Sequence, residues 1–168
     1  MNKLHILESL GFKITWRLLQ IGAKGSCEIP AVLSRDEIIE YLGDSLNNID
    51  NQTDYVISLI CEDNPIEFNT MLEKFAENDG CDISIQKRKW RAYLLKTLLD
   101  NLSRDPLQGL LDLMEFWLTM GKPDYCPHVF PTNDTIRKDY FTDATYDLLV
   151  KRNRDWLDEE VAEIIRSE

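Results

Sequence analysis

The stretch "DISIQKRKWRAYLLKTLLDNLSRDPLQGLLDLMEFWLTMG", from Asp82 to Gly121, decides the fold class. Its first half repeats apolar residues every three or four positions, the period of one helix face: Trp90, Leu94, Leu95, Leu98 and Leu102. Asp105 and Pro106 then supply an N-cap followed by a first-turn proline. A second stripe follows and stops at Gly121: Leu107, Leu110, Leu111, Met114, Trp117 and Leu118. The stretch therefore predicts two consecutive helices.

Helix signals also lie on both sides of this stretch. Ser34 and Glu37 form a capping box in front of an apolar stripe. Asn64 and Pro65 start a further helix, which is expected to stop near Gly80. The C-terminal segment, residues 142–167, reads as one long helix or as two helices with a break near residue 153.

Two short segments remain open between strand and helix. Tyr55–Ile60 is β-branched and apolar, so it is either a short strand or a buried helix. Asp82–Gln86 alternates like a strand, but it could equally begin a helix. Tyr125–Asn133 contains two prolines and no period, which indicates a loop. We therefore expect a mainly α protein: a single compact, bundle-like helical domain over residues 1–168, with one or two short strands at most.

Charge is distributed unevenly along the chain, whose net charge is −11. Residues 34–82 carry 13 acids and 2 bases, whereas residues 83–104 carry 6 bases and 1 acid. If the basic run is helical, Trp90 points inward, and the bases form a solvated edge: Lys87, Arg88, Arg91 and Lys96. The acidic total argues against binding nucleic acid or an anionic membrane surface. It is compatible with a basic protein partner.

The sequence offers little for catalysis or metal binding. Its two histidines are His5 and His128, and "CPH" at residues 126–128 supplies two ligands where zinc sites use four. It contains neither a phosphate-binding glycine loop nor a nucleophile elbow. We therefore expect a non-enzymatic protein without cofactor or metal; an enzyme of a type that the sequence does not disclose is the alternative.

Cysteine usage and hydropathy indicate a cytoplasmic protein. The chain has no apolar run long enough for a signal peptide or a membrane span. Four cysteines are expected to be buried, reduced thiols: Cys27, Cys61, Cys81 and Cys126.

The second half of the chain resembles a family of small bacterial proteins of uncharacterised helical domain type. The resemblance rests on Lys89–Trp90, the helix start at Pro106, Glu115–Phe116–Trp117 and the turn from Gly121 to Pro123. It also includes a late Trp156–Leu157 pair that is followed by three acids: Asp158, Glu159 and Glu160. Such proteins resemble the immunity partners of polymorphic toxins, including those of contact-dependent growth inhibition systems.

The resemblance implies an immunity protein that binds the C-terminal domain of a toxin, often a nuclease, and neutralises it. A nuclease must be basic to hold its substrate, so an acidic inhibitor can cover its active site and associate fast. The residues that we predict to bind this partner are Asp36, Glu37, Glu40, Asp44, Asp50, Asp54, Glu62, Asp63 and Glu67. The alternative is a helical adaptor or regulatory module with another protein partner.

Overall fold

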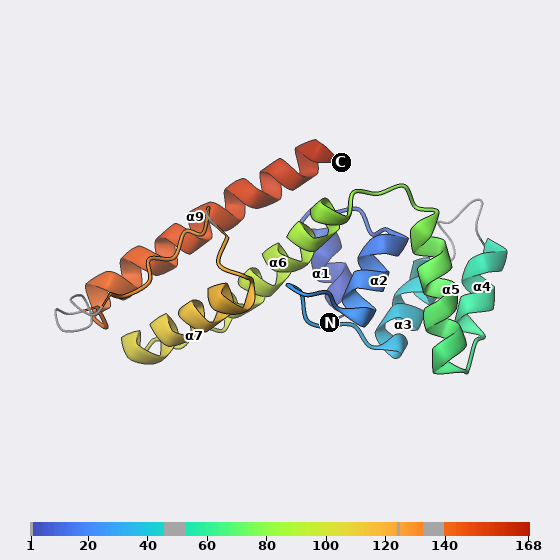
Figure 1. The fold of residues 1–168 in the computed structure, drawn as a ribbon, viewed down its shortest axis with the longest axis horizontal. Coiled ribbons are helices and arrows are strands. Elements are labelled where there is room, and N and C mark those ends of the chain that lie inside the picture. The colour runs from blue at the N-terminus through green and yellow to red at the C-terminus, as the bar shows by residue number, and fades with distance from the viewer. Residues whose placement is uncertain (1, 46–52, 124, 133–139) are drawn as a thin grey trace. The chain divides into compact units, whose positions relative to one another are not determined.

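The structure, a computed structural model, describes residues 2–45, 53–123, 125–132 and 140–168. Within these residues it contains eight α-helices and no strand (Figure 1). The mainly α fold class is thereby confirmed. The helices are α1 (Lys3–Ser9), α2 (Trp16–Lys24), α3 (Arg35–Ser45), α4 (Thr53–Ile60), α5 (Pro65–Glu77), α6 (Ile83–Asp100), α7 (Pro106–Thr119) and α9 (Asp143–Ser167).

Side-chain caps set the helix starts where the sequence predicts them. Ser34 Oγ accepts a hydrogen bond from the Glu37 backbone N–H at 3.2 Å, and Glu37 Oε2 accepts one from the Ser34 N–H at 3.0 Å. This reciprocal pair is a capping box at the start of α3. Asn64 and Asp105 cap α5 and α7 by accepting from backbone N–H groups two residues ahead, at 2.9 and 2.8 Å.

Both segments left open between strand and helix are helical. Tyr55–Ile60 lies within α4, and Asp82 caps α6 by accepting a hydrogen bond from the Ser84 N–H at 2.7 Å. The strand alternative is therefore wrong for both. The C-terminal segment is the single helix α9, without a break near Asn153, whose buried amide donates to the Leu149 carbonyl at 2.8 Å. The segment from Tyr125 is irregular as far as Thr132, and Asn133 lies outside the described residues.

The chain divides into two compact units. Unit 1 comprises residues 1–90 and 167–168, and unit 2 comprises residues 91–166. The boundary falls inside α6, between Trp90 and Arg91. Each unit has its own fully buried apolar side chains and thus its own core. That residues 1–168 form one domain stays a prediction.

The core of unit 1 is organised around Trp90. Its side chain is 0% exposed, and its indole N–H donates to the Leu18 carbonyl of α2 at 2.9 Å. The ring lies against Gly22, where an added Cβ would come within 2.4 Å of Trp90 Cζ2. The Gly22 carbonyl accepts hydrogen bonds from the N–H groups of Val32 and Leu33 at 2.8 and 2.9 Å. The absence of a side chain at Gly22 therefore allows α2 to pack closely against α6 and against the segment before α3.

The core of unit 2 contains one polar contact among its apolar residues. Trp117 and Asn153 are both 0% exposed, and the indole N–H of Trp117 donates to Asn153 Oδ1 at 2.7 Å. The Asn153 amide also donates to the Leu149 carbonyl, so both of its polar atoms are used. The buried apolar residues of α7 and α9 also include Leu110, Leu113, Leu149, Leu157 and Ile164.

Arg91 was expected on the solvated edge of α6 but is buried, and so is Lys89 in the same run. Lys89 is 0% exposed, donates to the Lys13 carbonyl at 2.7 Å and is paired with Glu168, all within unit 1. Arg91 is 5% exposed and donates to the Tyr125 hydroxyl at 2.6 Å within unit 2. Their long side chains bring the charge to a buried acceptor, which a helical-spacing argument does not anticipate. Lys87, Arg88 and Lys96 are partly exposed.

The expectation of buried cysteines is also wrong. All four thiols are free, but Cys27 and Cys61 are exposed, and Cys81 and Cys126 are half-buried. Cys27 lies in the irregular segment after α2, and Cys61 directly follows the end of α4. These positions lie outside the helices, so the cysteines do not contribute to the apolar helix faces.

Replacing Gly22 with alanine tests the close contact with Trp90. We expect Gly22→Ala to lower the free energy of unfolding by about 1–3 kcal/mol, because the methyl group overlaps a fully buried ring. Chemical denaturation followed by circular dichroism measures the change.

Gly43→Ala is the matched control, because Gly43 lies in α3 and a Cβ there meets nothing within 4 Å. This substitution should stabilise the protein by about 0.5–1 kcal/mol, since alanine loses less backbone entropy on folding than glycine. Equal effects of the two substitutions would contradict the role assigned to Gly22.

Candidate interaction surface

Three of the predicted acids form a row along α3. Asp36, Glu40 and Asp44 are four residues apart, so their side chains lie on one side of the helix. All three are exposed, with 93% exposure for the Asp36 side chain and 67% for that of Asp44. Glu40 Oε2 accepts a hydrogen bond from the Asn2 amide at 3.1 Å. Asp44 Oδ2 lies 3.8 Å from His5 Nε2. The row therefore lies beside α1 and faces solvent.

Glu37 differs from its neighbours because the fold already uses its carboxylate. It caps α3 with Ser34, and its Oε1 lies 2.5 Å from the Lys3 ammonium of α1. Partial burial raises the pKa of Glu37, but the hydrogen bonds from Lys3 and Ser34 outweigh burial, so that its pKa is lowered. Glu37 thus joins α1 to α3, and its part in binding a partner stays a prediction.

Arg35 brings a second group of acids together. Its guanidinium donates to the Glu62 carbonyl, lies 3.6 Å from Asp63 and 3.9 Å from Asp36, and packs 5.5 Å above the ring of Phe68. The start of α3 and the turn before α5 therefore meet at one place. The Asp63 side chain is fully exposed at 102%, so both aspartates beside Arg35 remain open to solvent.

The remaining predicted acids are more dispersed. Asp54 and Glu67 are exposed in the first turns of α4 and α5, where a carboxylate also stabilises the helix dipole. Asp50 lies outside the described residues. We define the acidic surface as the exposed acids of α3, α4 and α5 with the turn between the last two: Asp36, Glu40, Asp44, Asp54, Asp63 and Glu67.

Exposed apolar side chains accompany the acids on α4 and α5, a feature that the sequence reading missed. Tyr55 and Ile57 are 61% and 44% exposed, and Ile66 is 74% exposed. The Tyr55 ring meets the Phe75 ring of α5 edge-on, with the centroids 5.6 Å apart, and this contact orients the Tyr55 side chain. The apolar character of Tyr55–Ile60 suggested burial, whereas a helix of eight residues buries only one side.

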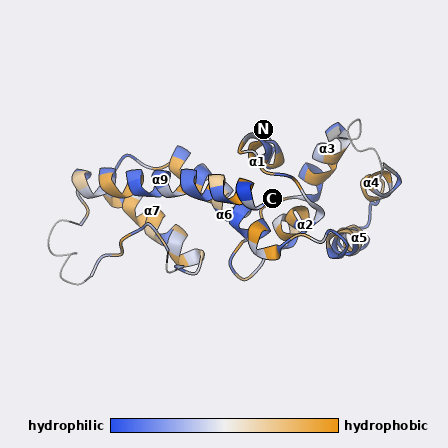
Figure 2. Cartoon of the chain, turned by 90° about the horizontal axis from the view of Figure 1, so that it is seen from above, coloured by the Kyte–Doolittle hydropathy of each residue, from blue (hydrophilic) through white to orange (hydrophobic). Residues whose placement is uncertain are grey.

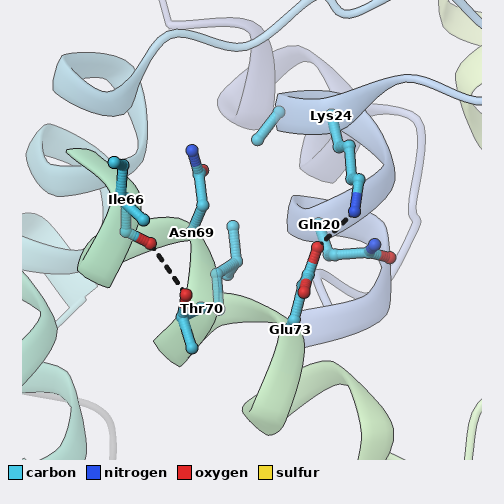
Figure 3. Close-up of a pocket in the computed structure, with 8 residues that line it drawn as sticks. Gln20, Lys24, Ile66, Asn69, Thr70 and Glu73 are labelled. Atoms are coloured by element: carbon cyan, nitrogen blue, oxygen red, sulfur yellow. Dashed lines mark hydrogen bonds and ion pairs between the residues drawn. The ribbon is translucent and has the colours of Figure 1, made fainter.

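A groove of about 310 Å³ lies between α2 and α5 (Figure 3). Gln20 and Lys24 come from α2, and Asn69, Thr70 and Glu73 come from α5, with Ile66 at the far end. Lys24 and Glu73 form an ion pair across it. The Thr70 hydroxyl donates to the Ile66 carbonyl at 2.9 Å. Lys24, Glu73 and Thr70 are therefore engaged in contacts within the groove, and the amide side chains of Gln20 and Asn69 also line it.

Burial favours the uncharged forms of the Cys126 and His128 side chains. Burial raises the pKa of the Cys126 thiol, whose sulfur lies 3.8 Å from the His128 carbonyl oxygen. Burial, and then the charge of Arg152, lower the pKa of His128 to about 4. Tyr140 donates its hydroxyl to the Val129 carbonyl at 2.7 Å, so the hydroxyl oxygen accepts from His128 Nε2 at 3.1 Å. The imidazole is therefore neutral, and within the described residues its buried Nδ1 has no partner.

Neither a metal cluster nor a membrane span is found in the described part of the chain. There, no three or more His, Cys, Asp or Glu side chains converge as metal ligands would. No helix among those described is long and apolar enough to cross a bilayer. The candidate site is thus the acidic surface defined above.

Residues 4–161 match the family described as "Uncharacterized protein conserved in bacteria (DUF2247)". The match covers most of the chain, so the protein belongs to this bacterial family. No curated protein and no solved structure matches the chain. The expected resemblance is confirmed at the level of a bacterial family of uncharacterised domain type, and its link to toxin immunity stays a prediction.

The neutral imidazole of His128 should make stability depend on pH. The folded protein keeps His128 neutral down to about pH 4, while an unfolded chain binds the proton near pH 6.5. The contribution of the neutral imidazole to the free energy of unfolding is fully present above pH 6.5 and is lost as the pH falls towards 4. We expect this loss to reach about 1–3 kcal/mol.

His128→Gln separates this effect from the titration of the carboxylates, because glutamine can still donate to Tyr140 but does not titrate. Unfolding free energies of both proteins, measured between pH 4 and pH 8, should diverge below pH 6.5. Parallel curves would show that His128 does not titrate as a buried neutral group.

Proposed function

We propose that this member of a bacterial family is a binding protein, not an enzyme, and that its acidic surface binds a basic surface on a protein partner. The observation that carries the proposal is the full exposure of Asp36 and Asp63, at 93% and 102%, on either side of Arg35. These two carboxylates are held close together by the fold and remain available to a partner. Four further exposed acids extend the surface: Glu40, Asp44, Asp54 and Glu67.

The internal ion pairs of unit 1 leave this surface negative. Lys3 is paired with Glu37, Lys24 with Glu73, and Lys89 with Glu168. Residues 34–82 contain only 2 bases, Arg35 and Lys74, against 13 acids. A field of one sign attracts a basic partner over roughly 10 Å at physiological salt and speeds association.

Exposed apolar side chains give such a surface contacts that charge alone does not provide. Tyr55 is the strongest candidate for an anchor, because its ring is 61% exposed and already oriented by Phe75. Aromatic anchors surrounded by charged residues are common centres of protein–protein interfaces. Tyr55 and Asp54 are adjacent in α4, so anchor and charge belong to one element.

We further propose that the partner is the C-terminal domain of a polymorphic or contact-dependent toxin, and that this protein is its cytoplasmic immunity protein. The support is the expected likeness of such small bacterial proteins to immunity proteins, together with the physical fit of an acidic inhibitor to a basic nuclease. The acids would cover the site that normally holds phosphates. No catalytic group, metal or cofactor takes part.

A helical adaptor with another protein partner is the second candidate. The groove between α2 and α5, with Ile66 exposed at its end, favours this alternative because it could take one side chain of a peptide. Gene order separates the candidates, since an immunity gene should directly follow a toxin reading frame.

The test is to express the toxin-like C-terminal domain that is encoded next to this gene, with and without this protein. Survival of the cells and co-purification of the two proteins would support the immunity proposal. If a toxin domain that kills the cells is neither bound nor neutralised, the immunity proposal is wrong.

Reversing the charge of the α3 row should weaken the complex through its association rate. We expect Asp36→Lys, Glu40→Lys and Asp44→Lys together to slow association by roughly tenfold or more at low salt, because long-range attraction is lost. Stopped-flow binding or surface plasmon resonance at several salt concentrations measures the change.

The matched control reverses three exposed acids of α9 in unit 2: Asp147, Asp158 and Glu159. It changes the net charge by the same amount at a different place. Equal slowing by both triple variants would assign the effect to total charge and remove the argument for a specific surface.

A further inference from the structure

Helix α7 carries two apolar stripes. Packing buries one of them completely, whereas in the other it half-buries the two middle residues, Leu111 and Met114, and leaves the two end residues exposed. Leu110, Leu113 and Trp117 are 0% exposed and form the packed stripe. A second stripe, which we call the outer stripe, is displaced around the helix from the packed one: Leu107, Leu111, Met114 and Leu118. Its end residues, Leu107 and Leu118, are 51% and 55% exposed. Apolar residues accordingly recur all along α7 in Figure 2.

The spacing of the outer stripe is that of a helix-packing seam. Its members are four, three and four residues apart, so they fall within roughly 60° of one another around the helix axis. The same alternation places the a and d residues of a coiled coil against a neighbouring helix. A surface helix of a globular protein usually has one apolar stripe and a polar remainder. The outer stripe is therefore suited to receive a second helix.

The chemistry beside the outer stripe defines that helix further. Gln108, Asp112 and Glu115 follow one another along the adjacent side of α7, and Gln108 Nε2 donates to Asp112 Oδ1 at 2.6 Å. Helix α7 contains no Lys or Arg between Pro106 and Thr119. An incoming helix meets negative charge along one edge of its apolar contact. Basic side chains on that edge would match it, whereas acidic ones would be repelled.

A second copy of this chain fits the outer stripe less well. Two α7 helices packed together would each bring the same Asp112 and Glu115 and no base of their own. Like charges next to a seam disfavour pairing, as they do at the edges of coiled coils. The acidic edge thus points to a different partner.

We propose that the outer stripe of α7 is a docking surface for an amphipathic α-helix of a partner protein, with aliphatic residues at coiled-coil spacing and Lys or Arg beside them. This surface lies in unit 2 and uses none of the acids on α3, α4 or α5. It therefore stands independently of the proposed function.

The probe is a designed helical peptide with leucine at the seam positions and lysine at the flanking positions, labelled for fluorescence anisotropy. Its counterpart has glutamate in place of lysine. The full-length protein should bind the lysine peptide and not the glutamate peptide, with affinity falling as salt is raised. The proposal would be overturned if both peptides bound equally well, or if neither peptide bound.

Binding must also be localised, because a lysine peptide can associate with any acidic protein. Leu107→Gln with Leu118→Gln should weaken binding by at least roughly tenfold. The control pair, Leu148→Gln with Ile165→Gln, alters two exposed apolar residues of α9, 57% and 44%, and should leave binding of the peptide unchanged. Because all four side chains are exposed, the thermal unfolding of both variants should remain close to that of the parent.

Two further measurements complete the test. Asp112→Asn with Glu115→Gln should reduce the salt dependence, whereas Asp147→Asn with Asp158→Asn should leave it unchanged. Analytical ultracentrifugation tests whether the parent protein forms a dimer through the outer stripe. We expect no dimer that is lost when Leu107 and Leu118 are replaced. Such a dimer would assign the outer stripe to a second copy and overturn the proposal of a basic partner helix.

Discussion

The packing of unit 1 depends on the close approach of α2 to Trp90 of α6. That approach exists only because residue 22 has no side chain, since a Cβ would overlap the indole ring. The same approach lets the indole N–H reach the Leu18 carbonyl and lets the Gly22 carbonyl receive the chain that leads into α3. The position of the acidic row on α3 thus depends on the contacts that Gly22 makes in α2, the preceding helix.

The distribution of charge follows from how the fold uses its bases. Lys89 and Arg91 make buried contacts, and Lys3 and Lys24 form ion pairs with acids on neighbouring helices. Acids outnumber bases, so many carboxylates have no base to pair with and remain at the surface. An acidic surface can therefore arise from composition alone, and its grouping around Arg35 is what distinguishes it here.

Local signals in the sequence were sufficient to predict α3, α5 and α7, whereas α1 and α2 were not predicted and α4 was left open between strand and helix. The caps at Ser34, Asn64 and Asp105 act within three residues, so they can be read without tertiary information. Two kinds of feature could not be predicted. The burial of Lys89 and the grouping of acids around Arg35 depend on residues 76 and 27 positions away in the chain. The exposure of Tyr55 depends on which side of a short helix is covered, and an apolar run does not indicate this.

The contact between Trp117 and Asn153 has a consequence for how α7 and α9 can slide along each other. The buried aliphatic residues of the two helices are four leucines and Ile164, which are similar in size, so a shift by one helical turn, about 5.4 Å, would still bring aliphatic groups together. The same shift would leave a buried indole N–H and a buried amide without partners, at a cost of about 1–3 kcal/mol each. Asn153 thus selects one alignment of α7 with α9 from several that apolar contacts alone would allow, as a single polar residue does in a coiled coil.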